Sequence, residues 1–243
     1  SVVKAMISHT KGRSVMNQTH HSWRSALDAP LDRSVRILVL LLLVPLLLSF
    51  TQPLWRISLQ APQYPNGLTM DIYAYKLRGG NDGQDINEIN ELNHYIGMKK
   101  IERSEFTDLD WIPFAFGILA LLALRVAAIG NLRSLVDLSV LTFYVSLFAM
   151  ARFVYREYVF GHNLDPHAAV KIKPFMPVIL GTKQLANFTT RGMPYTGSVL
   201  LGIFVLGLVT AMIWAFSRRR RTESRAVRGA EELGRSLAAG RAN

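Results

Sequence analysis

The chain of 243 residues contains no cysteine and only six histidines. The absence of thiols excludes disulfide bonds, thiolate metal sites and thiol nucleophiles. Metal chemistry is therefore restricted to histidine, methionine and carboxylate ligands. The sequence also lacks a P-loop, a dinucleotide fingerprint, a zincin pattern and a recognisable nucleophile–base pair. These absences favour a protein that is not an enzyme.

Half of the residues are apolar, and the formal net charge is +11. The apolar residues gather in long runs, each long enough for the roughly 20 residues that cross a bilayer, and the charges lie between the runs. Basic residues adjoin the runs, as expected for membrane orientation. No aromatic residues are interleaved with the C-terminal arginines to stack on bases, so the charge does not indicate nucleic-acid binding.

The apolar runs predict an α-helical integral membrane protein with transmembrane helices at residues 37–55, 111–129, 138–154 and 198–216. The first run is interpreted as an uncleaved anchor, because no small-residue cleavage site follows it. Arginines near the span ends predict that both termini are cytoplasmic. The cytoplasmic segments are then the basic N-terminal segment 1–36, the loop 130–137 and the Arg-rich tail 217–243. The loops 56–110 and 155–197 face the opposite side.

The loop 56–110 has the pattern of a small α+β module. Residues 68–75 alternate between apolar and polar side chains, which predicts a half-buried strand. Residues 85–96 have apolar side chains at helical spacing. Asp85 and Glu88 are spaced as in a capping box, and Gly97 is placed as a C-terminal cap.

The segment "ELNHYIGMKK" at residues 91–100 ends this predicted helix and places His94 four residues before Met98. Two interpretations stay open. His94 can be an ordinary residue at the negative end of the helix dipole, with Met98 as a hydrophobic contact. Alternatively, both are metal ligands, because imidazole and thioether together suit copper, particularly Cu(I).

The loop 155–197 is rich in proline and glycine and lacks clear periodicity. Its segment "GHNLDPH" contains His162, Asp165 and His167. This segment is interpreted either as a turn, which Asp165-Pro166 favours, or as a source of metal ligands. Because the topology places it on the same side as His94 and Met98, the two loops together predict a copper-binding face. The remaining histidines, His9, His20 and His21, lie on the opposite side.

The "LNHYIGMKKIE" segment, following the strand-like "GLTMDIYAYKL", resembles a group of bacterial polytopic membrane proteins with an Asn-His-Tyr-Ile-Gly-Met box; "GHNLDPHAAVKIKPF" is similar to a segment of such proteins. The matching positions are Asn93, His94, Tyr95, Gly97 and Met98. The group is associated with copper-handling gene neighbourhoods, such as those for nitrous oxide reductase maturation. The resemblance implies an accessory or metal-delivery role and a bacterial inner membrane, with both loops in the periplasm.

Two functions are therefore expected. The first is a non-catalytic accessory protein whose periplasmic face binds copper and assists metal delivery or the assembly of a copper or redox enzyme. The alternative is a structural subunit of a larger photosynthetic, respiratory or monooxygenase complex, with no metal of its own. Both imply the lipid bilayer and a protein partner as contacts.

Overall fold

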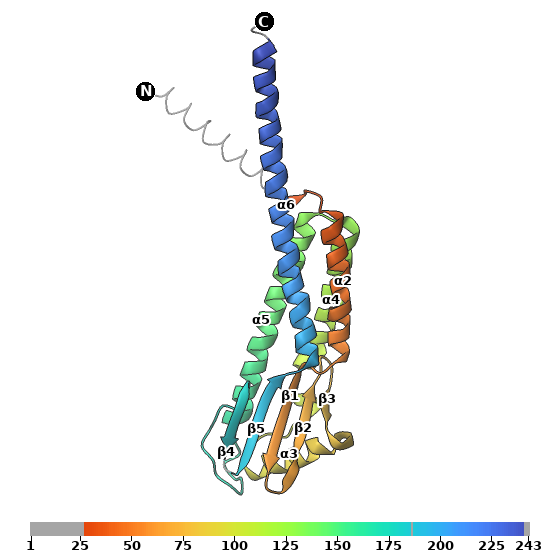
Figure 1. The fold of residues 1–243 in the computed structure, drawn as a ribbon. Helices are drawn as coiled ribbons and strands as arrows, with labels where there is room; N and C mark the ends of the chain where they lie inside the picture. The colour runs from red at the N-terminus through yellow and green to blue at the C-terminus, as the bar shows by residue number, and fades with distance from the viewer. Residues whose placement is uncertain (1–26, 186, 241–243) are drawn as a thin grey trace, which may run out of the picture.

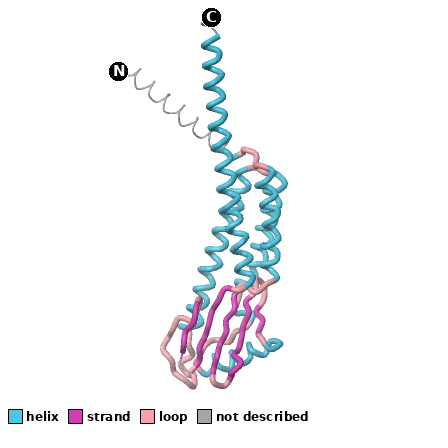
Figure 2. The backbone as a smooth tube through the Cα atoms, viewed as in Figure 1, coloured by secondary structure: helices cyan, strands magenta, loops and turns pink. Residues whose placement is uncertain are grey.

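The computed structural model describes residues 27–185 and 187–240. The chain forms two regions, a bundle of long helices, which we call the helical layer, and a small antiparallel sheet at one end of it (Figures 1 and 2). The helical layer consists of α2 (Arg33–Thr51), α4 (Asp108–Ile129), α5 (Leu132–His162) and α6 (Thr196–Gly240). The sheet module comprises residues 52–107 and 163–195. The predictions for His9, His20 and His21 lie outside the described residues.

Four helices are long and apolar enough to cross a membrane; in α6 this part is Thr196–Arg221. The prediction of four such helices and a small module that contains both a helix and a sheet is confirmed. The helices pack through fully buried side chains such as Val39, Leu46 and Phe204. Many of their other apolar side chains are exposed, including Leu121 and Leu206. Exposed apolar helix surface of this kind is compatible with a membrane location.

The helix bounds differ from the predicted spans at several ends. The predicted span 37–55 ends too late, because α2 stops at Thr51 and Trp55 begins the first strand. Conversely, α5 is much longer than the predicted span 138–154. It begins directly after Asn131, whose side chain accepts a hydrogen bond from the Ser134 amide at 3.0 Å. Hydropathy identifies the apolar part of a helix, whereas caps determine where the helix begins.

Both inter-helix loops contribute strands to one five-stranded sheet with the order β3-β2-β1-β5-β4. The strands are β1 (Trp55–Ala61), β2 (Tyr64–Ile72), β3 (Leu77–Gly79), β4 (Gly181–Leu185) and β5 (Phe188–Pro194). All neighbouring strands are antiparallel. The central pair joins the two loops, with Trp55 opposite Pro194 and Gln60 opposite Thr189. The irregular loop expected at 155–197 therefore ends in a β-hairpin.

A short helix, α3 (Gln84–Tyr95), covers part of one sheet face and lies between the 3-10 turns η1 (Asn81–Gly83) and η2 (Arg103–Glu105). Ile89 of α3 packs with Leu59, Leu68 and Met70 of the sheet in a small apolar core. The alternation predicted around residue 70 is confirmed, because Leu68 and Met70 are both buried. This core is the part of the module that holds the sheet and helix together.

One predicted cap of α3 is wrong and the other is confirmed. The N-cap is Gly83, and the Asp85 carboxylate instead accepts a hydrogen bond from the Thr69 amide of β2 at 2.7 Å. At the other end, Gly97 has φ +76° and donates to the His94 carbonyl, while Met98 donates to the Asn93 carbonyl at 2.8 Å. These two bonds form a Schellman motif. Asp85 was misassigned because its actual partner lies on a strand rather than in its own helix.

The sheet module is joined to the helical layer by backbone hydrogen bonds. Leu54 accepts a bond from the Tyr195 amide at 3.0 Å, and Pro53 accepts one from the Gly197 amide at 2.8 Å. These bonds hold the end of α2 beside the start of α6. The two helices also approach closely at Gly207, where an added Cβ would overlap the side chain of Leu42.

Candidate functional site

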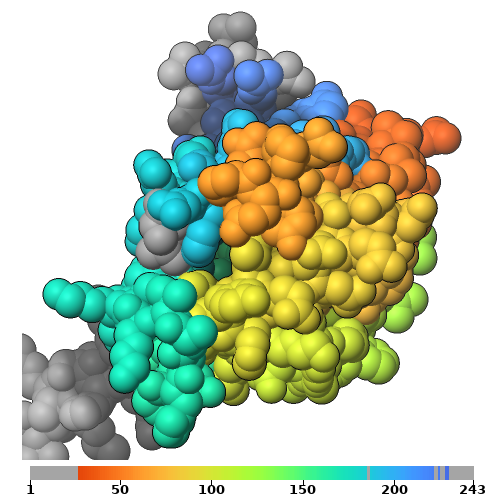
Figure 3. Space-filling view, turned by 90° about the horizontal axis from the view of Figure 1, so that it is seen from below, coloured from red at the N-terminus to blue at the C-terminus, as the bar shows by residue number. Residues whose placement is uncertain are grey.

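The structure brings together the two histidine-bearing segments through their backbones. The Asp165 amide donates to the Gly97 carbonyl at 2.8 Å, and the Val170 amide donates to the Tyr95 carbonyl at 2.9 Å. The chain after α5 therefore lies against the end of α3, as Figure 3 also shows for the green and yellow segments. We call this contact, made by residues 94–97 and 165–170, the α3 corner.

Gly97 is required at the α3 corner for two reasons. Its φ of +76° lies in the left-handed region that side chains other than glycine rarely adopt. A Cβ at this position would also lie 2.9 Å from the backbone nitrogen and oxygen of Asp165. The same glycine thus ends α3 and leaves room for the second loop.

The polar side chains of the corner point toward solvent. The His94 residue is exposed, and the His167 side chain is 91% exposed. Asp165 accepts a hydrogen bond from the His167 amide at 2.8 Å, and its carboxylate lies 3.3 Å from the His167 Nδ1. The backbone N–H of His167 lowers the pKa of Asp165, and the charges of His167 and His94 lower it further. His94, Asp165 and His167 thus share one electrostatic environment.

The other two predicted ligands lie elsewhere. His162 is in the last turn of α5, where its ring stacks on Tyr158 at 3.8 Å and its Nδ1 is 2.9 Å from the Tyr158 carbonyl. Met98 lines an internal cavity, whereas His94 is exposed. The His94–Met98 spacing therefore does not place both side chains at one point. Within residues 27–185 and 187–240, no three histidine, aspartate or glutamate side chains form a group that could hold a metal ion.

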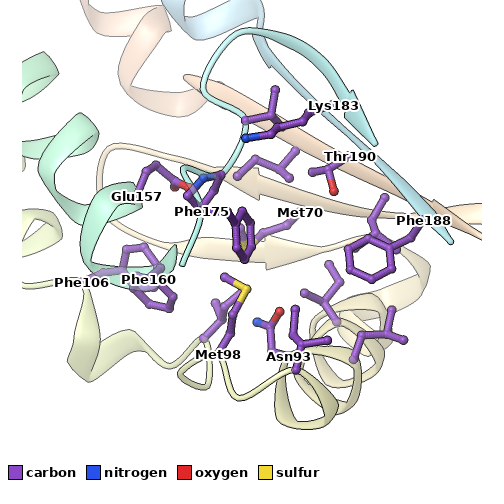
Figure 4. A pocket seen from close by; sticks show the side chains of 18 residues that line it. Met70, Asn93, Met98, Phe106, Glu157, Phe160, Phe175, Lys183, Phe188 and Thr190 are labelled. Carbon is purple, nitrogen blue, oxygen red and sulfur yellow. The ribbon is translucent and has the colours of Figure 1, made fainter. Parts of the chain in front are cut away.

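The cavity lined by Met98 has a volume of about 100 Å³ and lies between the sheet, α3 and the end of α5 (Figure 4). Its wall is mostly apolar and includes four phenylalanines. Four polar side chains, those of Asn93, Glu157, Lys183 and Thr190, also line it. The four phenylalanines are Phe106, Phe160, Phe175 and Phe188. Sequence reasoning missed this site, because its residues come from separate segments that only the sheet and α5 bring together.

A charged cluster joins α4 and α5 close to the sheet module. Asp108 accepts hydrogen bonds from Arg152 at 2.8 Å and from Arg156 at 3.2 Å. Arg152 and Asp108 form an ion pair in this cluster. Because Asp108 of α4 binds both arginines of α5, the cluster holds these two helices together beside the module.

No protein-family model, curated protein or solved structure matches this chain. The functional argument therefore rests on the geometry of the α3 corner and of the cavity.

Proposed function

We propose that this protein is a non-catalytic accessory protein of a bacterial inner membrane, and that its α3 corner binds a partner protein on the periplasmic side. The observation that carries this proposal is the pair of backbone hydrogen bonds that lock the two loops together at Gly97 and Tyr95. A surface whose backbone is already ordered loses less conformational entropy when a partner binds.

The exposed side chains of the corner support a recognition role. Tyr95 is 56% exposed and Val170 is 49% exposed, and they flank His94 and His167. Tyrosine is enriched in protein interfaces because it offers a large apolar ring and a polar tip at low entropic cost. An exposed tyrosine and valine on a fixed backbone, surrounded by polar groups, have the composition of a small interface core with a polar rim.

Site-specific photocrosslinking in cells tests this proposal. A photoreactive phenylalanine analogue replaces His167 in one variant and Thr182 in a matched control. Thr182 is also exposed, but it pairs with Arg191 on the sheet face opposite the cavity. We expect one discrete crosslinked protein from position 167 and none from position 182, and loss of the adduct in Tyr95→Ala. Equal crosslinking from both positions, or none from position 167, would contradict the proposal.

Copper binding at the same corner is a second candidate. It is favoured by the Asp165 carboxylate, which lies 3.3 Å from the His167 Nδ1, and by the bond from the Asp165 amide to Gly97, which brings this segment to the end of α3 that carries His94. Because Met98 lies in the cavity, the soft thioether does not contribute to the exposed group. Two imidazoles and a carboxylate are harder ligands, which suit Cu(II) better than Cu(I). To bind the metal, these three side chains would rotate toward one another while the backbone of the corner stays fixed.

A Cu(II) titration of the purified protein in detergent tests this second candidate. We expect stoichiometric binding that weakens at least tenfold in His94→Ala and in His167→Ala, as for the loss of one ligand contact. Met98→Leu and His162→Ala are the controls and leave the affinity unchanged. Binding that is absent, or that survives the double variant of His94 and His167, would remove copper from the corner.

A further inference from the structure

The cavity between the sheet and the end of α5 contains a carboxyl group that lacks a protein partner. Among the described residues, no hydrogen bond or ion pair reaches the Glu157 carboxyl. Part of the residue keeps contact with solvent, but protein atoms surround the carboxyl on most sides. A carboxyl group that is largely removed from water and has no partner is destabilising. A polar ligand in the cavity would offset this destabilisation.

The cavity is built to hold an apolar body beside this carboxyl. Its wall includes the rings of Phe106, Phe160, Phe175 and Phe188, and the side chains of Met70 and Met98 (Figure 4). Protein cores contain few voids larger than a water molecule. The volume of about 100 Å³ approaches that of a cavity of roughly 150 Å³ known to bind benzene. The ligand therefore has one ring or an equally short chain.

The mostly apolar wall favours an uncharged ligand. Lys183 also lines the cavity, but its ammonium group already donates to the Met176 carbonyl at 2.8 Å and lies 5.9 Å from the Phe175 ring centre. Lys183 is exposed, so its ammonium group keeps its contact with solvent. A charged ligand would lose its hydration on entering this mostly apolar site, which is costly. A neutral hydroxyl can donate to Glu157 without that cost.

We infer that this cavity binds a small uncharged molecule with an apolar body and one hydroxyl group, which donates a hydrogen bond to Glu157. The site differs from the exposed surface of the α3 corner: His94 and His167 are exposed, whereas Met98 and Glu157 line the cavity, and only the buried side chain of Ile96 is shared by the two. The inference does not depend on the proposed partner or on copper.

Nuclear magnetic resonance of the full chain in lipid nanodiscs tests this site, with carbon-13 in the methionine methyl groups. Met70 and Met98 report on the cavity, whereas Met150 of α5 and Met212 of α6 report on probe dissolved in lipid. The probes are benzyl alcohol, ethylbenzene and benzylamine, which have the same number of heavy atoms. We expect saturable shifts at Met70 and Met98 with benzyl alcohol, and weaker binding of the other two probes.

Two variants identify the residues responsible. In Glu157→Leu, the preference for benzyl alcohol over ethylbenzene should fall roughly tenfold, as expected for the loss of one hydrogen bond. The control Glu91→Leu, at an exposed position of α3, should keep that preference. Thr190→Leu fills the cavity and should abolish binding of both probes.

Several outcomes would overturn the inference. One is that Met70 and Met98 shift no more than Met150 does. Another is that ethylbenzene or benzylamine binds the original chain as tightly as benzyl alcohol. Both outcomes are measured on the unaltered protein, so they test the ligand-binding inference even where a variant does not fold.

Discussion

The helical layer and the sheet module differ in the kind of contact that forms them. In the four apolar helices, only 17–33% of the most apolar window is buried inside the protein. Each helix satisfies its own backbone hydrogen bonds, so its existence depends on local sequence. In the module, β1 pairs with β5 although more than 120 residues of chain lie between the two strands. The difference shows that a local pattern suffices for the layer, whereas the module needs both loops at once.

The largest expected effect comes from Gly97→Ala, which should destabilise the sheet module and leave the helical layer unchanged. Left-handed strain and the contact with Asp165 should together cost about 3 kcal/mol of module stability. Thermal unfolding in detergent micelles measures this loss, and limited proteolysis should cut residues 163–175 faster. The control Gly202→Ala, in α6, has open space around the new Cβ and should be close to neutral. Equal stability of the two variants would contradict the role of Gly97.

Asp85→Ala should have the next largest effect, because it removes the link between α3 and β2. Asp85 is buried, and its carboxylate accepts a bond from the Thr69 amide at 2.7 Å. Losing a charged hydrogen bond costs about 2 kcal/mol. Urea unfolding followed by circular dichroism measures the change, with the exposed residue Glu91→Ala as control. A loss no greater than that of the control would show that α3 is held by its apolar contacts alone.

Gly207→Ala should affect the helical layer by a smaller amount and leave the sheet intact. The new Cβ meets the end of the Leu42 side chain, which can rotate, so the cost should be about 1 kcal/mol. Thermal unfolding monitored at helical wavelengths, together with amide exchange in β1 and β5, separates the two regions. Faster exchange in the strands would contradict their independence from this helix contact.

The smallest effect concerns the titration of Asp165 at the α3 corner. Its folded pKa is lowered, first by the His167 backbone N–H and then by the charges of His167 and His94. The interaction is therefore fully present above the unfolded value of about 3.9, and it is lost as the pH falls through the folded pKa. Carboxyl carbon-13 titration should give a value below the ordinary one, and His94→Ala should raise it slightly. No difference between the two proteins would mean that His94 does not influence the corner.

Part of the candidate site could be predicted from the sequence. Gly97 was assigned as a helix cap because glycine after a helical pattern has a known local role, and the Schellman bonds confirm it. The separation of His94 from Met98 could not be foreseen, because Met98 follows the cap and its direction depends on the sheet. Glu157 and Lys183 were not identified, since nothing local connects a helix residue with a strand residue that follows a long irregular loop.

The sequence by itself determined the number of long apolar helices, the presence of a strand and a helix in the first loop, and the glycine that ends this helix. These features follow from hydropathy and from short-range hydrogen bonding, which a few neighbouring residues decide. Only the tertiary structure decided that the second loop completes the sheet and that Asp165 docks on Gly97. It also enclosed Glu157 beside the aromatic rings. Those outcomes depend on pairing between distant segments, which no local pattern encodes.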